Sequence, residues 1–213
     1  MNEHEWAQVL FDQKIVQLRP DQPFRWTSGL LSPIYCDNRQ IISLPQLRRA
    51  VVEEMAKQVK GWERPIDVVA GTATAGIPYA AWLAERFELP MIYVRSQAKA
   101  HGMGKQIEGR IKAGDQVVIV EDLVSTGKSS WQSIEAVKAA DAIPLGVVSI
   151  FQYGFPSTQQ KFNEAGYRLN SLTNLATLLE VLQNSGTWQQ EQLATINDWK
   201  EDPWAWTAQH EAK

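Results

Sequence analysis

Four short apolar runs, rich in β-branched side chains, most constrain what this chain can fold into. They occupy residues 66–70, 91–94, 117–120 and 145–151. Nearly every residue in each run is apolar, which is typical of strands that are covered on both faces. Helical patterns at roughly 76–87 and 127–140 separate the runs, so strands and helices alternate along the chain. This alternation predicts an α/β fold with a doubly wound, mostly parallel sheet.

The flanking segments predict smaller elements around that sheet. Apolar residues recur at helical spacing between Leu44 and Val59, residues 34–37 resemble a strand, and residues 175–182 resemble a helix. We expect a single domain over residues 1–213, with a core at about 44–152 and a cap formed by 1–43 and 153–213. The Trp-rich tail from residue 187 is expected to dock by aromatic burial rather than to form a ligand or partner site.

Composition excludes several functional classes. A formal net charge of −3 argues against general nucleic-acid binding, which normally needs a basic surface. No apolar run approaches the roughly 18 residues of a membrane span, and the acidic N-terminus lacks a signal-peptide pattern. We therefore expect a cytoplasmic protein without membrane contact. One cysteine and three dispersed histidines offer no zinc spacing.

Two adjacent acids end the third apolar run, in the stretch VVIVEDLVSTGKSS (117–130). In open parallel sheets, ligands bind beyond the carboxyl ends of the strands, which is where Glu121 and Asp122 are expected. The following turn leads into a helix, so it presents free backbone N–H groups and nearby hydroxyls to an anion. A suitable ligand would place a phosphate on these N–H groups and donate from vicinal hydroxyls to the carboxylates. A ribose 5-phosphate has that shape.

This stretch has two other interpretations. Asp122 or Ser125 could simply cap the helix, but capping explains one acid and not two. The Thr-Gly-Lys-Ser sequence also resembles the end of a Walker A loop. That motif requires glycine five residues before Gly127, where this chain has Asp122. The nucleoside-triphosphate interpretation therefore fails on spacing.

The stretch also resembles the phosphoribosyl pyrophosphate (PRPP) motif of type I phosphoribosyltransferases. Further segments are similar to the orotate phosphoribosyltransferase branch of that family, and the resemblance runs from about residue 5 to residue 185. These segments are TSGLLSPIYCDNR (27–39), GTATAGIP (71–78), YVRSQAKAHGMGKQIEG (93–109) and FQYGFP (151–156). The resemblance implies a homodimeric, Mg²⁺-dependent enzyme of pyrimidine and UMP biosynthesis. It would convert orotate and PRPP into orotidine 5′-monophosphate and pyrophosphate.

The resemblance also implies roles for individual residues. Glu121 and Asp122 would hold the ribose hydroxyls, and Asp122, Lys99 and His101 would be catalytic. The 5-phosphate would be bound by the anion turn, which is Leu123, Val124, Ser125, Thr126, Gly127, Lys128 and Ser129. Ser125 would also meet orotate. Mg²⁺ would be held mainly by PRPP and water, without direct protein ligands.

A basic loop, residues 95–109, carries Arg95, Lys99 and His101. The resemblance implies that this loop reaches the pyrophosphate in the neighbouring subunit's site. Loss of pyrophosphate builds negative charge on the leaving group, so cations aimed there stabilise the transition state. Gly102 and Gly104 would let the loop close and exclude water. The alternative is an ordinary solvated basic turn.

The chain departs from the family at several positions. Several members have lysine where this chain has Thr27 and Leu31, many have it at the position of Ala75, and close relatives have it at that of Gln97. With fewer cations near the diphosphate, Lys99 is expected to matter more. Other branches supply an arginine after the last core strand for the orotate carboxylate, and the stretch at 151–154 has none. We hypothesise that Arg39 replaces it, together with backbone N–H groups around 28–29; a surface ion pair is the alternative role.

Two rival functions remain open. A phosphoribosyltransferase could use another base, such as a purine, on the same sugar site. A non-catalytic regulator could keep the PRPP site as a sensor and bind nucleic acid, although neither the acidic balance nor the tail provides a nucleic-acid module.

Overall fold

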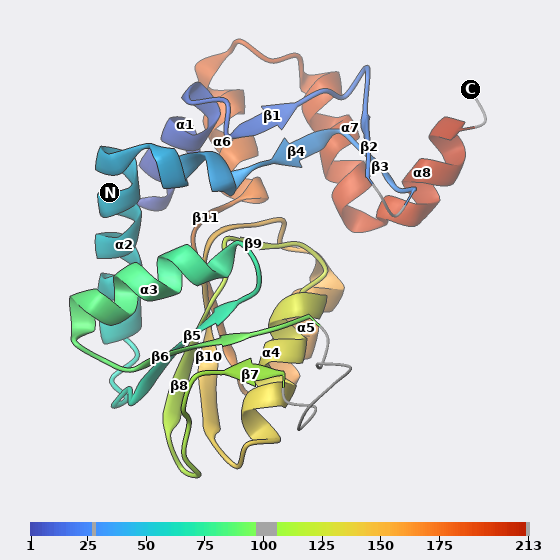
Figure 1. Cartoon of the computed structure of the whole chain (residues 1–213). Coiled ribbons are helices and arrows are strands. Elements are labelled where there is room, and N and C mark those ends of the chain that lie inside the picture. The colour runs from blue at the N-terminus through green and yellow to red at the C-terminus, as the bar shows by residue number, and fades with distance from the viewer. Residues whose placement is uncertain (27–28, 97–105, 212–213) are drawn as a thin grey trace.

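The centre of the computed structural model is a sheet with the strand order β11-β10-β8-β5-β6-β7 (Figure 1). The structure describes residues 1–26, 29–96 and 106–211. The strands are β5 (Val68–Thr72), β6 (Met91–Val94), β7 (Ile107–Glu108), β8 (Gln116–Val120), β10 (Ile143–Gln152) and β11 (Arg168–Asn174). Neighbouring strands pair in parallel, except that β7 runs antiparallel to β6. The short strand β9 (Leu123–Val124) pairs with β10.

Helices cover both faces of this sheet. On one face lie α2 (Pro45–Lys60) and α3 (Gly76–Phe87), and on the other lie α4 (Lys128–Lys138) and α5 (Pro156–Glu164) (Figure 1). The residues of β8 after Gln116 are all apolar, and the packing of this strand on both faces explains why. Val118 and Val120 pack in the hydrophobic cluster on the side of α2 and α3. Val117 and Ile119 pack in the cluster on the side of α4 and α5. Each face of a two-sided sheet must be buried, so the predicted doubly wound α/β fold is confirmed.

The predicted core elements agree closely with those observed. The helix at 76–87 and the strand at 91–94 have the predicted bounds. The strand β5 begins two residues later than predicted, and β10 extends further in both directions. The sequence did not reveal β11, an edge strand in which polar residues interrupt the apolar ones. The sheet therefore continues beyond residue 152, into the range expected for the cap.

The N-terminal and C-terminal segments of the chain pack against each other above the sheet (Figure 1). The N-terminal part contains α1 (Glu3–Asp12), β1 (Val16–Leu18), β2 (Phe24–Arg25), β3 (Leu31–Ser32), β4 (Ile34–Cys36) and the 3₁₀ helix η1 (Asn38–Ser43). The C-terminal part contains α6 (Leu175–Ser185), α7 (Gln190–Glu201) and α8 (Pro203–Glu211). The strand β1 pairs with β4, and β2 pairs with β3. That the whole chain forms one domain with a small cap stays a proposal.

The tail docks on the hairpin formed by β2 and β3. Trp199 and Trp206 are buried, whereas Trp204 is 61% exposed. The indole N–H of Trp199 donates to the carbonyl of Leu31 at 2.9 Å, and the N–H of Leu31 donates to Thr207 Oγ1 at 3.1 Å. Side chains of the tail thus satisfy backbone groups that a two-stranded hairpin leaves unpaired. Among the described helices, none is long and apolar enough to cross a membrane.

Candidate functional site

The acid pair, Glu121 and Asp122, lies at the carboxyl end of β8. The chain bends there, because β8 ends at Val120 and β9 begins at Leu123, where it pairs further along β10. The N–H of Glu121 donates to the carbonyl of Val148 at 3.0 Å, which holds the bend against β10. The helix α3 also begins at this rim, since a Cβ on Gly76 would overlap the carbonyl oxygen of Val120. Only glycine allows that approach.

Glu121 points into the protein and is 6% exposed. Its carboxylate accepts from the hydroxyl of Ser130 at 3.4 Å. Burial, and then the charge of Asp122, raise the pKa of Glu121 to about 8, while hydrogen bonds from the hydroxyls of Thr72, Ser130 and Ser129 lower it. Such a shift is typical of carboxyl groups in functional sites.

Asp122 is more accessible than its neighbour and lies half-buried at the surface of the rim. Burial raises its pKa, whereas the backbone N–H groups of Leu123 and of Asp122 itself, and the charge of Arg39, lower it. The two acids therefore have different surroundings. Glu121 is enclosed by hydroxyl donors, and Asp122 is held by backbone donors where an incoming hydroxyl group can reach it.

The anion turn begins directly after the acid pair and leads into α4. Gly127 precedes the helix with φ +69°, and a Cβ there would lie 2.8 Å from Thr158 Cγ2, so the turn needs glycine. No side chain of the described residues caps α4. Its first N–H groups are therefore able to bind an anion, which the helix dipole also favours.

The side chains of the anion turn differ in accessibility. Thr126, Lys128 and Ser129 are exposed, Ser125 and Leu123 are half-buried, and Val124 is packed in the core beneath the turn. The helix α5 supports the turn from below. The hydroxyl of Thr158 donates to the carbonyl of Ser125 at 3.4 Å. The sequence therefore placed the acids and the turn at one rim, and the structure brings them together.

The basic loop leaves the sheet at the same rim, because it follows the carboxyl end of β6 and returns as β7. At its base the N–H of Arg95 donates to the carbonyl of Gln106 at 2.9 Å. The guanidinium of Arg95 lies 3.4 Å from the carboxylate of Glu108. Lys99 and His101 lie outside the described residues, and so do residues 27–28.

Arg39 forms an ion pair with its near neighbour. Its Nε lies 2.7 Å from Asp37 Oδ1, its side chain is 62% exposed, and the hydrogen bond to Asp37 raises its pKa. This surface ion pair is the alternative role that the sequence allows for Arg39. Arg39 also acts electrostatically on Asp122, so it lies near the acid pair. Its assignment to an orotate carboxylate stays a prediction.

Sequence reasoning missed three residues that contact or support the acid pair. Thr72 acts on Glu121, Asn38 donates to the backbone of Asp122, and Tyr79 donates to Asn38. Thr72 and Asn38 lie inside the segments GTATAGIP and TSGLLSPIYCDNR, but nothing in either segment indicates a contact across the fold. Such contacts depend on which strands become neighbours.

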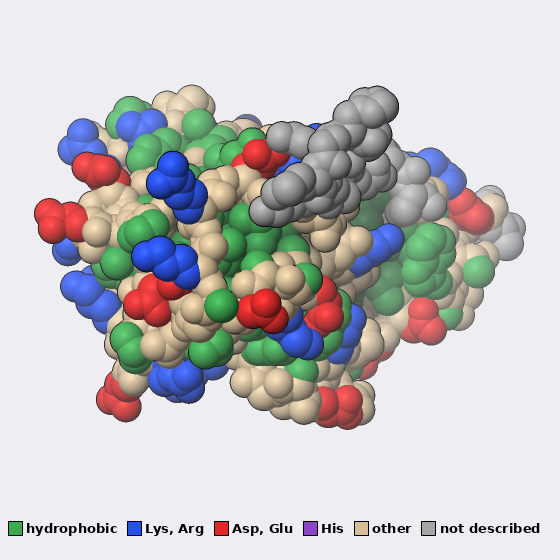
Figure 2. Space-filling view, turned by 60° about the horizontal axis from the view of Figure 1, so that its bottom comes forward, with side chains coloured by type: hydrophobic (Ala, Val, Ile, Leu, Met, Phe, Trp, Pro, Cys, Tyr) green, Lys and Arg blue, Asp and Glu red, His purple; other side chains and the backbone are tan. Residues whose placement is uncertain are grey.

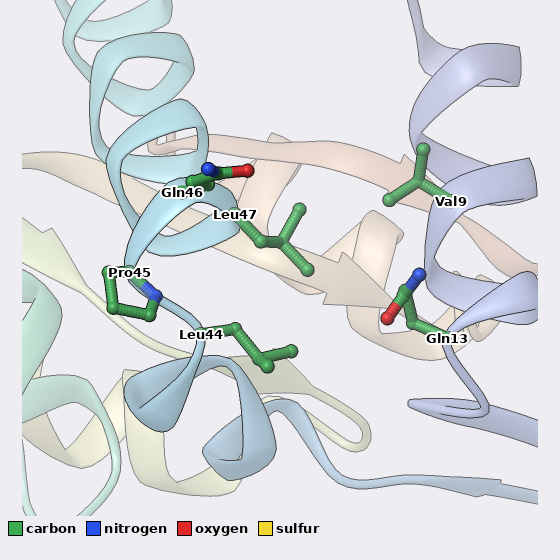
Figure 3. A pocket seen from close by; sticks show the side chains of 6 residues that line it. All are labelled: Val9, Gln13, Leu44, Pro45, Gln46 and Leu47. Carbon is green, nitrogen blue, oxygen red and sulfur yellow. The ribbon is translucent and has the colours of Figure 1, made fainter.

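Charged side chains and a groove also occur away from this rim (Figure 2). Figure 2 shows Lys and Arg side chains interspersed with Asp and Glu on the viewed face. A groove of about 440 Å³ lies between α1 and the start of α2, and it is lined by Val9, Gln13, Leu44, Pro45, Gln46 and Leu47 (Figure 3). This groove has no charged lining residue. Within the described part of the chain, no group of three or more His, Cys, Asp or Glu is placed to hold a metal ion.

This chain is similar to known proteins in sequence. A model of the phosphoribosyl transferase domain matches residues 40–161. The chain is similar to an orotate phosphoribosyltransferase of Listeria monocytogenes, at 46% identity over 96% of this chain and 98% of that protein.

Two solved structures are also similar. The first is the UMP synthase of Leishmania donovani, with 31% identity and a TM-score of 0.76 over 93% of this chain and 42% of that chain. This chain thus spans less than half of that protein. The second is the orotate phosphoribosyltransferase of Aeropyrum pernix, with 30% identity and a TM-score of 0.72 over 83% of this chain and 97% of that chain.

Proposed function

Because this chain belongs to the phosphoribosyltransferase family, with orotate phosphoribosyltransferases as relatives over nearly its full length, we propose that it transfers the 5-phosphoribosyl group of PRPP to orotate. The products are orotidine 5′-monophosphate and pyrophosphate, on the route to UMP. The observation that carries this proposal is the acid pair lying directly beside the anion turn at one rim of the sheet. These two features suit the two ends of a phosphorylated ribose.

In this proposal the anion turn binds the 5-phosphate, and the acid pair binds the ribose hydroxyls. The uncapped start of α4 supports the first role, because its N–H groups and dipole favour a dianion. The half-buried carboxyl of Asp122 supports the second, because charged acceptors make strong hydrogen bonds to hydroxyl groups. Ser125 is a half-buried residue of the anion turn and is our candidate for contact with the base.

During transfer the bond from C1 of the ribose to the pyrophosphate oxygen breaks as the ring nitrogen N1 of orotate bonds to C1, and the proton of N1 passes to the departing pyrophosphate or to water. Positive charge develops on the sugar and negative charge on the leaving group. A carboxylate near the ribose stabilises the first charge. Arg95, Lys99 and His101 would stabilise the second, which is greater in the transition state than in PRPP.

We also propose that Mg²⁺ takes part, entering with the diphosphate. Mg²⁺ prefers hard oxygen ligands and often keeps several waters, with one or two carboxylates plus substrate phosphates completing its shell. The carboxylate of Asp122 is an oxygen ligand of that kind at this rim, and it could contact the ion through a water molecule. The ion would neutralise charge on the leaving pyrophosphate.

A homodimer and a cytoplasmic location complete the proposal. The loop at 95–109 is proposed to act in the site of the neighbouring subunit. The position of its base, at the carboxyl end of β6, supports an approach to a diphosphate at this rim. Analytical ultracentrifugation and mixing of two separately inactive variants, Lys99→Ala and Asp122→Asn, would test this. Restored activity in the mixed dimer is expected only if the loop serves the partner's site.

One assay tests the reaction. Purified protein is mixed with PRPP, Mg²⁺ and, in turn, orotate, uracil, hypoxanthine and adenine, and base consumption is followed by absorbance. We expect loss of orotate alone. Consumption of another base would show that the protein uses a different acceptor. Binding of PRPP without consumption of any base would favour the sensor.

A further inference from the structure

Asn38 contacts the acid pair from a distant part of the sequence. Its side-chain Nδ2 donates to the carbonyl oxygen of Asp122 at 2.6 Å. The N–H of Phe151 reaches the same oxygen at 3.4 Å, a weaker contact. Asp122 lies between the end of β8 and the start of β9, where the regular ladder is interrupted. Asn38 therefore supplies the shorter of these two hydrogen bonds to the backbone of Asp122.

Asn38 is itself held in place from the other side. The hydroxyl of Tyr79, on α3, donates to the carbonyl of Asn38 at 2.7 Å. Both side chains are fully buried. Burial raises the pKa of Tyr79 well above its usual range, so the hydroxyl keeps its proton and remains a donor. Two hydrogen bonds thus connect α3, η1 and the rim that carries the acids.

The carboxylate of Asp122 takes its orientation from the same stretch of backbone. The N–H groups of Leu123 and of Asp122 itself act on this carboxylate and lower its pKa. A rotation of the peptide group at Asp122 would therefore move the carboxylate too. Because Asn38 holds that peptide group, it controls where the carboxylate points.

An apolar side chain at position 38 would avoid one cost that asparagine carries. Asn38 Oδ1 is buried and has no hydrogen-bond partner among the described residues. A buried acceptor without a partner is unfavourable, and an apolar side chain of similar size would avoid that cost. The directed N–H group is what an apolar residue would lose.

We propose that Asn38 is a positioning residue, which orients the carboxylate of Asp122 toward the ribose of PRPP without touching the substrate. This inference rests on the proposed function, because it needs a sugar at the acid pair. It predicts a loss that is specific for PRPP. In Asn38→Leu, kcat/KM for PRPP should fall about 10- to 100-fold, the size expected from a small misplacement of a reacting group. The KM for orotate should stay within about twofold.

The matched control is Gln58→Leu. Gln58 also donates from a side-chain amide to a backbone carbonyl, that of Ser171 at 3.0 Å, and its Oε1 is also buried without a partner in the described structure. This bond joins α2 to β11 rather than to the rim. Both variants should lose thermal stability, but Gln58→Leu should keep its kinetic constants. An equal loss of PRPP affinity in both variants would overturn the proposal.

Two further measurements keep the test decisive. Tyr79→Phe keeps the buried ring and removes the hydroxyl that holds Asn38, so the KM for PRPP should rise about threefold with the KM for orotate unchanged. No change in Tyr79→Phe would count against the proposal even if Asn38→Leu fails to fold.

Calorimetric titration of the wild-type protein and of each variant with PRPP and Mg²⁺ separates this proposal from the proposed function. If the wild-type protein binds PRPP but transfers the phosphoribosyl group to no base, the proposed function is wrong. The role of Asn38 is then judged from the PRPP affinity of Asn38→Leu. A wild-type protein that binds no PRPP overturns both.

Discussion

Glu121→Gln should make the ligand-free protein more stable at neutral and alkaline pH, while impairing its use of PRPP. In the unfolded chain this carboxyl has its ordinary pKa of 4.5, whereas burial raises its pKa to about 8 in the folded protein. Below pH 4.5 the group is protonated in both states and has no effect on stability. Between these two values the unfolded chain releases a proton that the folded chain keeps, so the free energy of unfolding falls as pH rises.

The size of this effect follows from the distance between the two pKa values. Each pH unit in this window costs about 1.4 kcal/mol. At pH 7 the carboxyl therefore destabilises the fold by about 3 kcal/mol, and at pH 5 by less than about 1 kcal/mol. Glutamine is neutral and isosteric, so it removes this cost. For a protein of this size the gain at pH 7 corresponds to a rise in Tm of about 6 to 12 °C.

Urea denaturation and thermal melts at pH 5, 7 and 8.5 measure the difference between the two proteins. The control is Glu135→Gln, which changes an exposed carboxyl on α4 and should show no comparable pH dependence. A stability difference between Glu121→Gln and wild type that is flat across these pH values would refute the reasoning. It would mean that Glu121 is ionised when buried and is stabilised by Thr72 and Ser130. In the same variant, kcat/KM for PRPP should fall.

The remaining predictions concern catalysis, the base and packing. Lys99→Ala should lower kcat by roughly 10²- to 10³-fold, because one preorganised transition-state donor is lost; a steady-state assay that finds more than half of normal turnover would contradict this. If Arg39 holds the orotate carboxylate, Arg39→Ala should raise the KM for orotate, and an unchanged KM would leave Arg39 as the partner of Asp37 alone. Gly76→Ala should cost about 1 to 3 kcal/mol in urea denaturation, since its Cβ would overlap the carbonyl of Val120; wild-type stability would show that α3 can move away.

Local sequence was enough to predict the core. The buried residues of strands such as β8 are apolar, and the period of α3 is regular, so the type of each element followed from local pattern. The acid pair and the anion turn were also predictable, because they are adjacent in the chain and their place at a strand end follows from the fold class.

Local sequence was not enough at the edge of the sheet or in the cap. The strand β11 is interrupted by polar residues, and α7 and α8 show their role only through the hairpin on which they pack. The contact between Asn38 and Asp122 joins residues 84 positions apart. Nothing near Asn38 in the sequence indicates that partner.

The sequence by itself determined that this chain has a mostly parallel sheet covered on both faces, with an acid pair and a turn before a helix at a strand end, because burial and turn chemistry act over neighbouring residues. Only the tertiary structure decided how the two acids differ. Glu121 is enclosed by hydroxyl groups from β5 and α4, and Asp122 is held by Asn38 from the N-terminal segment. Burial and hydrogen bonding depend on which distant segments meet, and these meetings set the pKa of Glu121 and the orientation of Asp122.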